Sequence, residues 1–132
     1  MKTIFLDYME PLQLEATDKS PEVRLDSKEG KILIHGISDQ EDALGFYFPV
    51  IQWMDAYIKN PPSHTEAVFE FKYYNTASAK SIYEVLKRLA EIHKSGNTIE
   101  TKWFYPKGDD HLLSEIENFS DIAHLPIHAI EK

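Results

Sequence analysis

Three polar side chains that could accept a phosphate or cap a helix lie within four residues, at Asn75, Thr76 and Ser78. They separate a segment of alternating residues from a segment of helical spacing, which places them at a strand-to-helix junction. A helix start has unpaired backbone N–H groups, which such side chains can cap and which also favour a phosphate. The residue types therefore indicate either a hydroxyl, at Thr76 or Ser78, that is placed where a phosphate is tolerated, or hydroxyls that only cap the helix.

The elements around this junction follow from the hydrophobic pattern. Apolar and polar residues alternate over Phe69–Tyr74, as in a strand with one buried face. The apolar spacing then predicts a helix from about Thr76 to Lys94, ended by Gly96 in a left-handed conformation. Alternation returns at Thr98–Tyr105. Strand, helix and strand in this order predict a parallel, right-handed crossover.

The remaining segments are predicted from the same signals. Ser38-Asp39-Gln40-Glu41 has the pattern of a capping box, so a helix should begin there and end before Pro61-Pro62. The other expected elements are an edge strand at Leu12–Ala16, a hairpin at Glu22–His35, a short helix over 112–122 and a last strand at Leu125–Ile130.

The strands predict the architecture, because each has one apolar and one polar face. A sheet covered by helices on both sides would have nearly continuous apolar strands, so this one should be covered on one side only. We therefore expect a two-layer α/β domain over residues 1–132. The residues expected to be accessible on the open face are Glu70, Lys72, Glu100 and Lys102, and those expected to be buried are Phe69, Phe71, Ile99 and Trp103.

The helix predicted after Ser38 carries two apolar stripes. One fits the core and contains Leu44, Tyr47, Phe48, Ile51, Met54 and Ile58. The other contains Phe46, Val50, Trp53 and Tyr57 and is more apolar than a solvated face needs. This second stripe either packs against other parts of the chain or forms a partner surface centred on Trp53 and Tyr57.

Composition excludes several classes of function. The chain has 132 residues, 42% of them apolar, which suits one globular domain. Its formal charge of −8 without a basic cluster argues against nucleic-acid or anionic-membrane partners, and it contains no cysteine. Acidic residues follow the first Met too early for a signal peptide, so a cytoplasmic protein is expected. The histidines and glycines show no metal-binding, catalytic or phosphate-loop spacing, so no cofactor is expected.

Four stretches of the sequence resemble the SiaC family of bacterial regulatory phosphoproteins in order and spacing. They are Thr17–Val23, Gly36–Ala43, Tyr74–Lys80 and Thr101–Tyr105. The third is the most specific, because it is similar to the family's Asn-Thr-Ser-Ser-x-Lys turn, with Ala77 where a serine is common. The second departs from the family, which often has Ser-Tyr-Pro-Glu where this chain has Ser38-Asp39-Gln40-Glu41.

The resemblance implies both a fold and a function. The fold would be similar to that of the anti-sigma factor antagonists, the STAS domains, with a mixed sheet and helices mainly on one face. The family resemblance makes Thr76 the phosphoacceptor of a histidine-kinase-type ATPase, with a PP2C-type phosphatase reversing the mark. It also implies that the unphosphorylated, non-enzymatic protein binds and activates a diguanylate cyclase, which links it to c-di-GMP signalling and biofilm control.

Two interpretations follow for the use of this domain. In the first it is a phosphorylation switch whose partner-binding residues are Asn75, Thr76, Ser78, Lys80, Trp53 and Tyr57. In the second it is a STAS-like carrier of a small molecule or lipid, which its many aromatic residues would suit.

Overall fold

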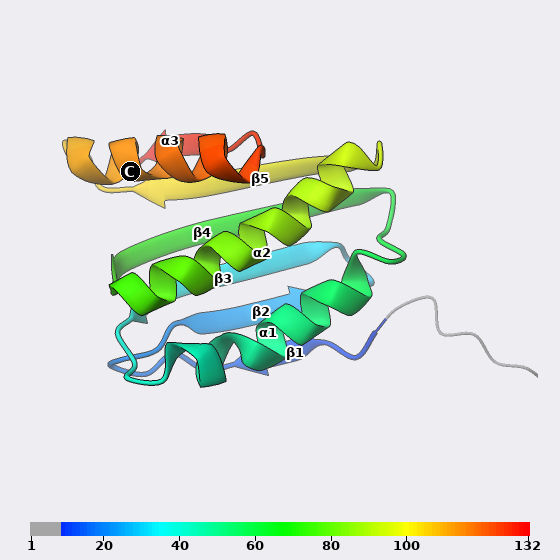
Figure 1. The fold of residues 1–132 in the computed structure, drawn as a ribbon, viewed down its shortest axis with the longest axis horizontal. Coiled ribbons are helices and arrows are strands. Elements are labelled where there is room, and N and C mark those ends of the chain that lie inside the picture. Colours follow the sequence, from blue (N-terminus) through cyan, green and yellow to red (C-terminus); the bar gives the residue numbers. More distant parts are fainter. Residues whose placement is uncertain (1–8) are drawn as a thin grey trace, which may run out of the picture.

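The computed structural model describes residues 9–132, which form a six-stranded sheet and three helices (Figure 1). In chain order the elements are β1 (Leu12–Leu14), β2 (Glu22–Asp26), β3 (Lys31–Ser38), α1 (Ala43–Tyr57), β4 (His64–Tyr74), α2 (Thr76–Lys94), β5 (Thr98–Tyr105), α3 (Asp110–Ala123) and β6 (His128–Glu131). The expected absence of a signal peptide rests on the first residues of the chain, which lie outside the described residues.

The order of strands in the sheet follows the order in the sequence, from β1 to β6. The strands β1, β2 and β3 are antiparallel, whereas β3, β4, β5 and β6 are parallel. Each helix therefore connects two neighbouring parallel strands, and the predicted crossover through α2 is one of three. The carboxyl ends of β3, β4 and β5 lie at one edge of the sheet, where all three helices begin.

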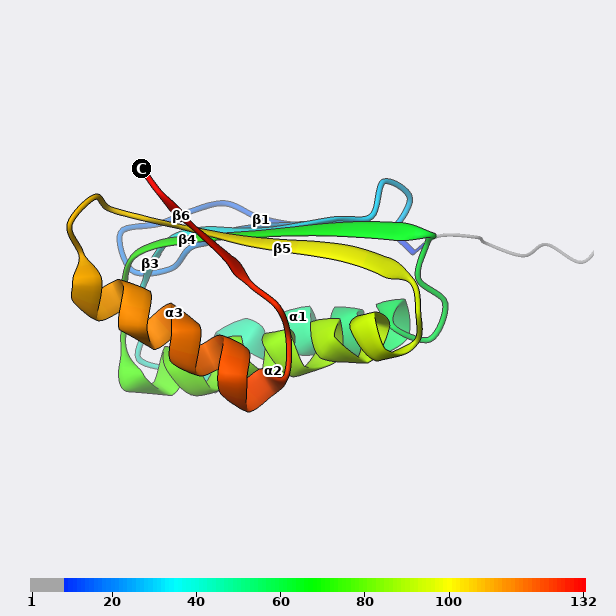
Figure 2. The ribbon, with the colours of Figure 1, turned by 90° about the horizontal axis from the view of Figure 1, so that it is seen from above.

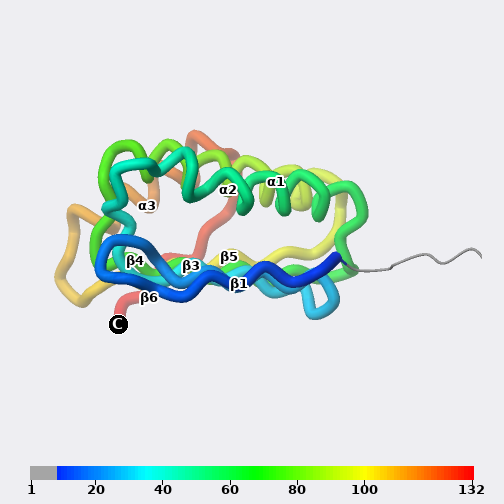
Figure 3. The backbone as a smooth tube through the Cα atoms, turned by 90° about the horizontal axis from the view of Figure 1, so that it is seen from below, coloured from blue at the N-terminus to red at the C-terminus, as the bar shows by residue number. Residues whose placement is uncertain are grey.

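All three helices cover the same face of the sheet, as Figures 2 and 3 show from opposite sides. The predicted two-layer α/β architecture with a mixed sheet is thus confirmed. The core lies between the layers and includes Phe69, Phe71 and Trp103 from the sheet and Ile82 and Leu86 from α2.

The open face of the sheet carries charged side chains that pair across strands. Lys72 is exposed, while Glu70, Glu100 and Lys102 are half-buried, and Ile99 on the other face is also only half-buried. The Lys102 Nζ atom lies 3.1 Å from Glu66 Oε2 and 3.0 Å from Glu100 Oε1. Ion pairs of this kind satisfy the polar groups of a face that no helix covers.

No helix in residues 9–132 is both long enough and apolar enough to cross a bilayer.

Candidate functional site

The candidate site lies where β4 ends and α2 begins. Asn75 has extended backbone angles and is the cap of α2, and its Oδ1 atom accepts a hydrogen bond from Ser78 N at 2.8 Å. Thr76 is the first residue of the helix, and its side chain is exposed. Its hydroxyl makes no hydrogen bond with any residue from 9 to 132. Thr76 is therefore accessible and is not needed to cap the helix.

Ser78 has the opposite environment, although it is only two residues away. It is fully buried, and its Oγ atom donates a hydrogen bond to the backbone oxygen of Ser38 at 3.0 Å. The same atom lies 2.8 Å from Ser38 Oγ. The Ser78 hydroxyl is therefore closed to solvent, whereas the Thr76 side chain is exposed.

Ser38, the last residue of β3, forms hydrogen bonds with side chains of α1 and α2. Its Oγ atom lies 2.8 Å from Tyr47 Oη on α1 as well as 2.8 Å from Ser78 Oγ on α2. The pKa of Tyr47 is raised to about 12, because burial raises it by more than the hydrogen bond with Ser38 lowers it. The Tyr47 hydroxyl therefore stays protonated and can donate to Ser38. The backbone of Asn75 also donates to the Ser38 oxygen at 3.0 Å. These bonds fix the start of α2 against the end of β3.

The predicted capping box at Ser38 is wrong. Strand β3 continues to Ser38, which pairs with Tyr74, and α1 begins at Ala43 with Asp42 as its cap. The Oδ1 atom of Asp42 accepts from Gly45 N at 2.9 Å. The Ser38 hydroxyl is already bonded to α1 and α2 side chains, so it cannot serve the backbone of the helix start.

The interpretation of Trp53 and Tyr57 as an exposed partner surface is also corrected. Their exposed fractions are 7% and 1%, because the segment before β1 and the sheet cover this side of α1. Trp53 Nε1 donates to the Glu10 oxygen at 2.9 Å, and Tyr57 Oη lies 2.6 Å from Thr65 Oγ1. Val50 is buried and Phe46 half-buried, so the second stripe packs against the chain's own residues.

The exposed apolar residues of α1 come instead from the stripe predicted to be core. Leu44 and Phe48 are 77% and 60% exposed. The sequence does not reveal this, because both stripes are apolar and together they cover more of the helix than one layer of sheet can bury.

Lys80 is exposed one turn after Thr76, and it forms no ion pair with residues 9–132.

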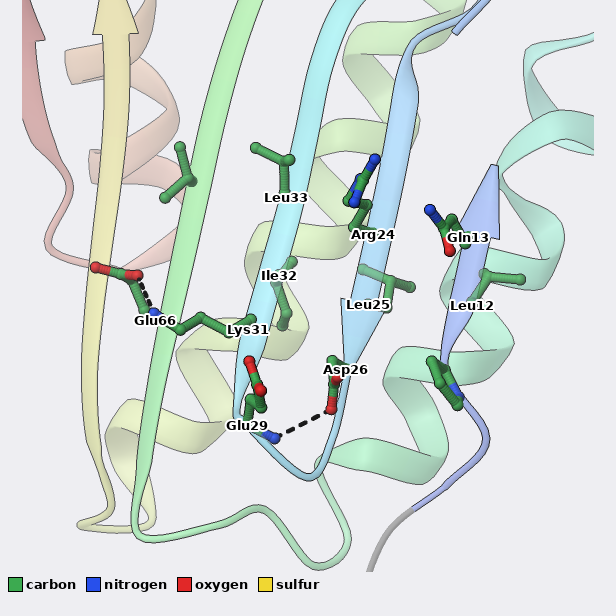
Figure 4. A pocket seen from close by; sticks show the side chains of 12 residues that line it. Leu12, Gln13, Arg24, Leu25, Asp26, Glu29, Lys31, Ile32, Leu33 and Glu66 are labelled. Atoms are coloured by element: carbon green, nitrogen blue, oxygen red, sulfur yellow. Dashed lines mark hydrogen bonds and ion pairs between the residues drawn. The ribbon is translucent and has the colours of Figure 1, made fainter. Parts of the chain in front are cut away.

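A pocket of about 400 Å³ lies on the open face of the sheet, over β1 to β4 (Figure 4). Leu33 and Val68 give it an apolar floor, and charged side chains surround them. Lys31 Nζ lies 2.8 Å from Glu66 Oε1, and hydrogen bonds from Lys31 and Lys102 lower the pKa of the Glu66 carboxyl. A carrier of lipid needs an enclosed apolar cavity. This pocket is instead open and bordered by an ion pair, so it is not an enclosed lipid cavity.

Within residues 9–132 no three histidine, aspartate or glutamate side chains gather closely enough to hold a metal ion. The acidic side chains near the junction have structural roles. Asp42 caps α1, and Asp39 Oδ1 lies 3.4 Å from Asn75 Nδ2. The start of α2 therefore presents the exposed Thr76 hydroxyl beside carboxylates that hold local structure.

The chain is thus a two-layer α/β domain in which helix α2 begins with an exposed threonine. The family model described as SiaC family regulatory phosphoprotein matches residues 14–132, so the chain belongs to that family. An uncharacterized protein of Pseudomonas aeruginosa is 24% identical over 118 residues, which cover 89% of this chain and 94% of that protein.

Solved structures confirm the fold. SiaC of Pseudomonas aeruginosa superposes with a TM-score of 0.83 at 23% identity, covering 94% of this chain and 100% of that one. A chain in the crystal structure of the diguanylate cyclase SiaD in complex with its activator SiaC, also from Pseudomonas aeruginosa, gives a TM-score of 0.84 at 22% identity. That match covers 92% of this chain and 99% of the other.

The different roles of Asn75 and Thr76 can be measured. Asn75→Ala should lower the free energy of unfolding by about 0.5–2 kcal/mol, because it removes the helix cap. Thr76→Ala should change it by less than about 0.5 kcal/mol, because the exposed hydroxyl bonds to no described residue. Urea unfolding followed by circular dichroism gives both values. Equal losses in the two variants would mean that Thr76 also caps α2.

Proposed function

We propose that this chain is a non-enzymatic regulatory domain that binds a diguanylate cyclase, and that phosphorylation of Thr76 weakens this binding. The observation that carries the proposal is the exposed Thr76 hydroxyl at the first residue of α2, beside a fully buried Ser78. Membership of a family of regulatory phosphoproteins supports it. So does the similarity to SiaC, which activates the cyclase SiaD in Pseudomonas aeruginosa.

The position of Thr76 is suited to a reversible phosphate. The amides at the start of α2 and the dipole of the helix favour a negative group there. Asn75 already supplies the cap, so modification of Thr76 costs the helix no hydrogen bond. A phosphate adds a charge of about −1.5 to −2, which must be desolvated or repelled when a partner covers it. The helix should therefore remain folded while the partner is released.

The proposal includes the enzymes that set the phosphorylation state. A histidine-kinase-type ATPase would phosphorylate Thr76, and a PP2C-type phosphatase would restore the hydroxyl. The unphosphorylated domain would activate the cyclase and so raise c-di-GMP, which promotes biofilm formation. The exposure of Thr76 is compatible with access by both enzymes.

Incubation with the cognate kinase and ATP, followed by tandem mass spectrometry, tests the acceptor. The expected product carries phosphate on Thr76, and Thr76→Ala should accept none. Phosphate on Ser78 alone would show that this end of α2 opens and would move the switch. No phosphate at either residue would refute the phosphorylation switch.

Binding to the diguanylate cyclase of the source cell tests the effect of the charge. Thr76→Glu should weaken binding by about 5–150-fold, the range of ordinary allosteric coupling, and Thr76→Ala should bind as the wild type does. A glutamate carries less charge than a phosphate, so protein phosphorylated in vitro should show the larger effect. Isothermal titration calorimetry measures all three forms. Equal affinities would separate the binding function from phosphorylation.

A further inference from the structure

The loop between β3 and α1, residues 39–42, is tied to the start of α2 by one side chain. Asn75 Nδ2 donates to the backbone oxygen of Gln40 at 3.3 Å and to Asp39 Oδ1 at 3.4 Å. The Oδ1 atom of the same amide caps α2. Asn75 therefore connects this loop to the helix whose first residue is Thr76, at one edge of the sheet (Figure 1).

These two bonds are weaker than the contacts that lie behind them. Ordinary N–H···O hydrogen bonds are about 2.7–3.2 Å long, and both bonds from the Asn75 amide are longer. The buried Ser38, by contrast, accepts from Asn75 N at 3.0 Å and lies 2.8 Å from Ser78 by its hydroxyl. Because Asp39 is exposed, the loop can separate from α2 while Ser38 stays in place.

The loop is acidic, and no basic side chain neutralises it. Asp39, Glu41 and Asp42 are exposed, and none of them forms an ion pair with a described residue. No lysine or arginine occurs from 39 to 58, and Lys19 contacts Asp39 through backbone atoms only, at 2.7 Å. Asp39 also stands where the SiaC family often has a tyrosine, so a response to charge at this position belongs to this chain.

Asp39 lies close to the proposed phosphoacceptor, because Thr76 directly follows Asn75. Adding one Cα–Cα step, the length of the Asn75 side chain and the 3.4 Å bond places the Asp39 carboxylate within roughly 10 Å of the Thr76 backbone. This is about one Debye length at 0.1 M salt, so charges at the two positions are only partly screened. A phosphate on Thr76, with a charge of about −1.5 to −2, therefore repels Asp39.

We propose that Asp39 is the residue through which the loop senses a phosphate on Thr76. The phosphate repels the carboxylate, the bond from Asn75 to Asp39 breaks, and residues 39–42 separate from α2. Asp42 lies in the same loop and caps α1 through Gly45 N at 2.9 Å, so the first turn of α1 should loosen as well. This inference rests on the proposed function and adds a conformational step to its regulation.

The first turn of α1 is suited to this response. Pro49 lies within α1 and has no N–H group, so the Gly45 oxygen lacks its usual helical hydrogen bond. The turn depends all the more on Asp42, whose backbone oxygen also accepts from Phe46 N at 3.1 Å. Loss of order in the loop should therefore appear at the amides of Gly45 and Phe46.

Amide hydrogen exchange, followed by NMR, tests the proposal on protein that carries a genetically encoded phosphothreonine at position 76. The amides of Gly45 and Phe46 should exchange at least about fivefold faster than in the unmodified protein, because the loop opens more often. The amides of Asn75 and Ser78 should keep their protection, because α2 and its cap stay in place.

Two variants that each remove one carboxylate separate Asp39 from the general charge of the loop. Asp39→Asn keeps an oxygen that can accept from Asn75 but has no charge, so the phosphate should change exchange at Gly45 by less than about twofold. Glu41→Gln is the matched control, because it removes the same charge from the same loop without touching the Asn75 contact. It should respond as the wild type does. Circular dichroism and thermal unfolding establish that both variants are folded.

The outcomes separate this inference from the proposed function. Unchanged exchange in the loop would overturn the inference, while the function stands if the phosphate still weakens binding to the cyclase. An equal response in Asp39→Asn and the wild type would show that Asp39 is not the sensor. If exchange responds as expected but binding to the cyclase does not, the charge coupling is real and the proposed function fails.

Discussion

A glutamate in place of Ser78 should lower the free energy of unfolding by about 3–5 kcal/mol, because it places a carboxylate in a site closed to water. Ser78 is fully buried, and its hydroxyl donates a hydrogen bond to the backbone oxygen of Ser38 and accepts one from the Ser38 hydroxyl. A glutamate at Thr76 should change the same free energy by less than about 0.5 kcal/mol. It is exposed there, and a negative charge at the start of α2 is favourable.

Urea unfolding of Ser78→Glu, Thr76→Glu and the wild type measures this contrast directly. Ser78→Ala is the matched control, since it removes the hydrogen bonds without adding a charge and should cost about 1–3 kcal/mol. If Ser78→Glu is as stable as Thr76→Glu, the start of α2 opens readily. Ser78 would then again be a candidate acceptor.

The sequence predicted the second half of the fold closely because the signals there are local. Helix α2 and strand β5 have the bounds that the spacing indicated, Thr76–Lys94 and Thr98–Tyr105. An asparagine cap begins the helix, Gly96 with a φ of 92° follows it, and strict alternation defines the strand. Each signal acts over a few residues, so no knowledge of distant parts of the chain was required.

The start of α1 was predicted wrongly because a tertiary contact overrides the local pattern. Ser38 matches a helix cap by its spacing to Glu41. In the fold it ends β3, and its hydroxyl bonds to Ser78, which is 40 positions away. The burial of Trp53 has a similar origin, since its partner Glu10 is 43 positions away. Spacing along the chain contains no information about either contact.

The choice between Thr76 and Ser78 could have been made from the sequence. Ser78 precedes Ile82 by four residues, so it lies on the buried stripe of α2 that Ile82, Val85 and Leu89 form. Thr76 lies away from that stripe. Extending the helical spacing back through the junction therefore predicts one inward and one outward hydroxyl. The exposure of Leu44 and Phe48 has no comparable signal, because it depends on which side of α1 is covered by residues 9–11 and the sheet.

Trp103→Ala should lower the free energy of unfolding by about 3–5 kcal/mol, the usual cost of removing a large buried ring. Trp103 lies on β5 with no exposed surface. Its ring stacks on Phe119 of α3, with ring centroids 5.4 Å apart, and on Phe69 of β4 at 5.3 Å. These contacts attach α3 to the sheet, so the variant should lose much of the packing between α3 and β5.

Trp103→Phe is the control that separates ring packing from polar effects. The indole Nε1 atom is buried and has no hydrogen-bond partner among residues 9–132, so its removal leaves no group unpaired. The phenylalanine ring keeps most of the stacking, and this variant should therefore lose much less stability than Trp103→Ala. Chemical unfolding, followed by circular dichroism so that the lost tryptophan does not matter, measures both. An equally large loss in Trp103→Phe would mean that the indole nitrogen contributes a stabilising bond, for instance to a buried water, and that ring stacking is not the main term.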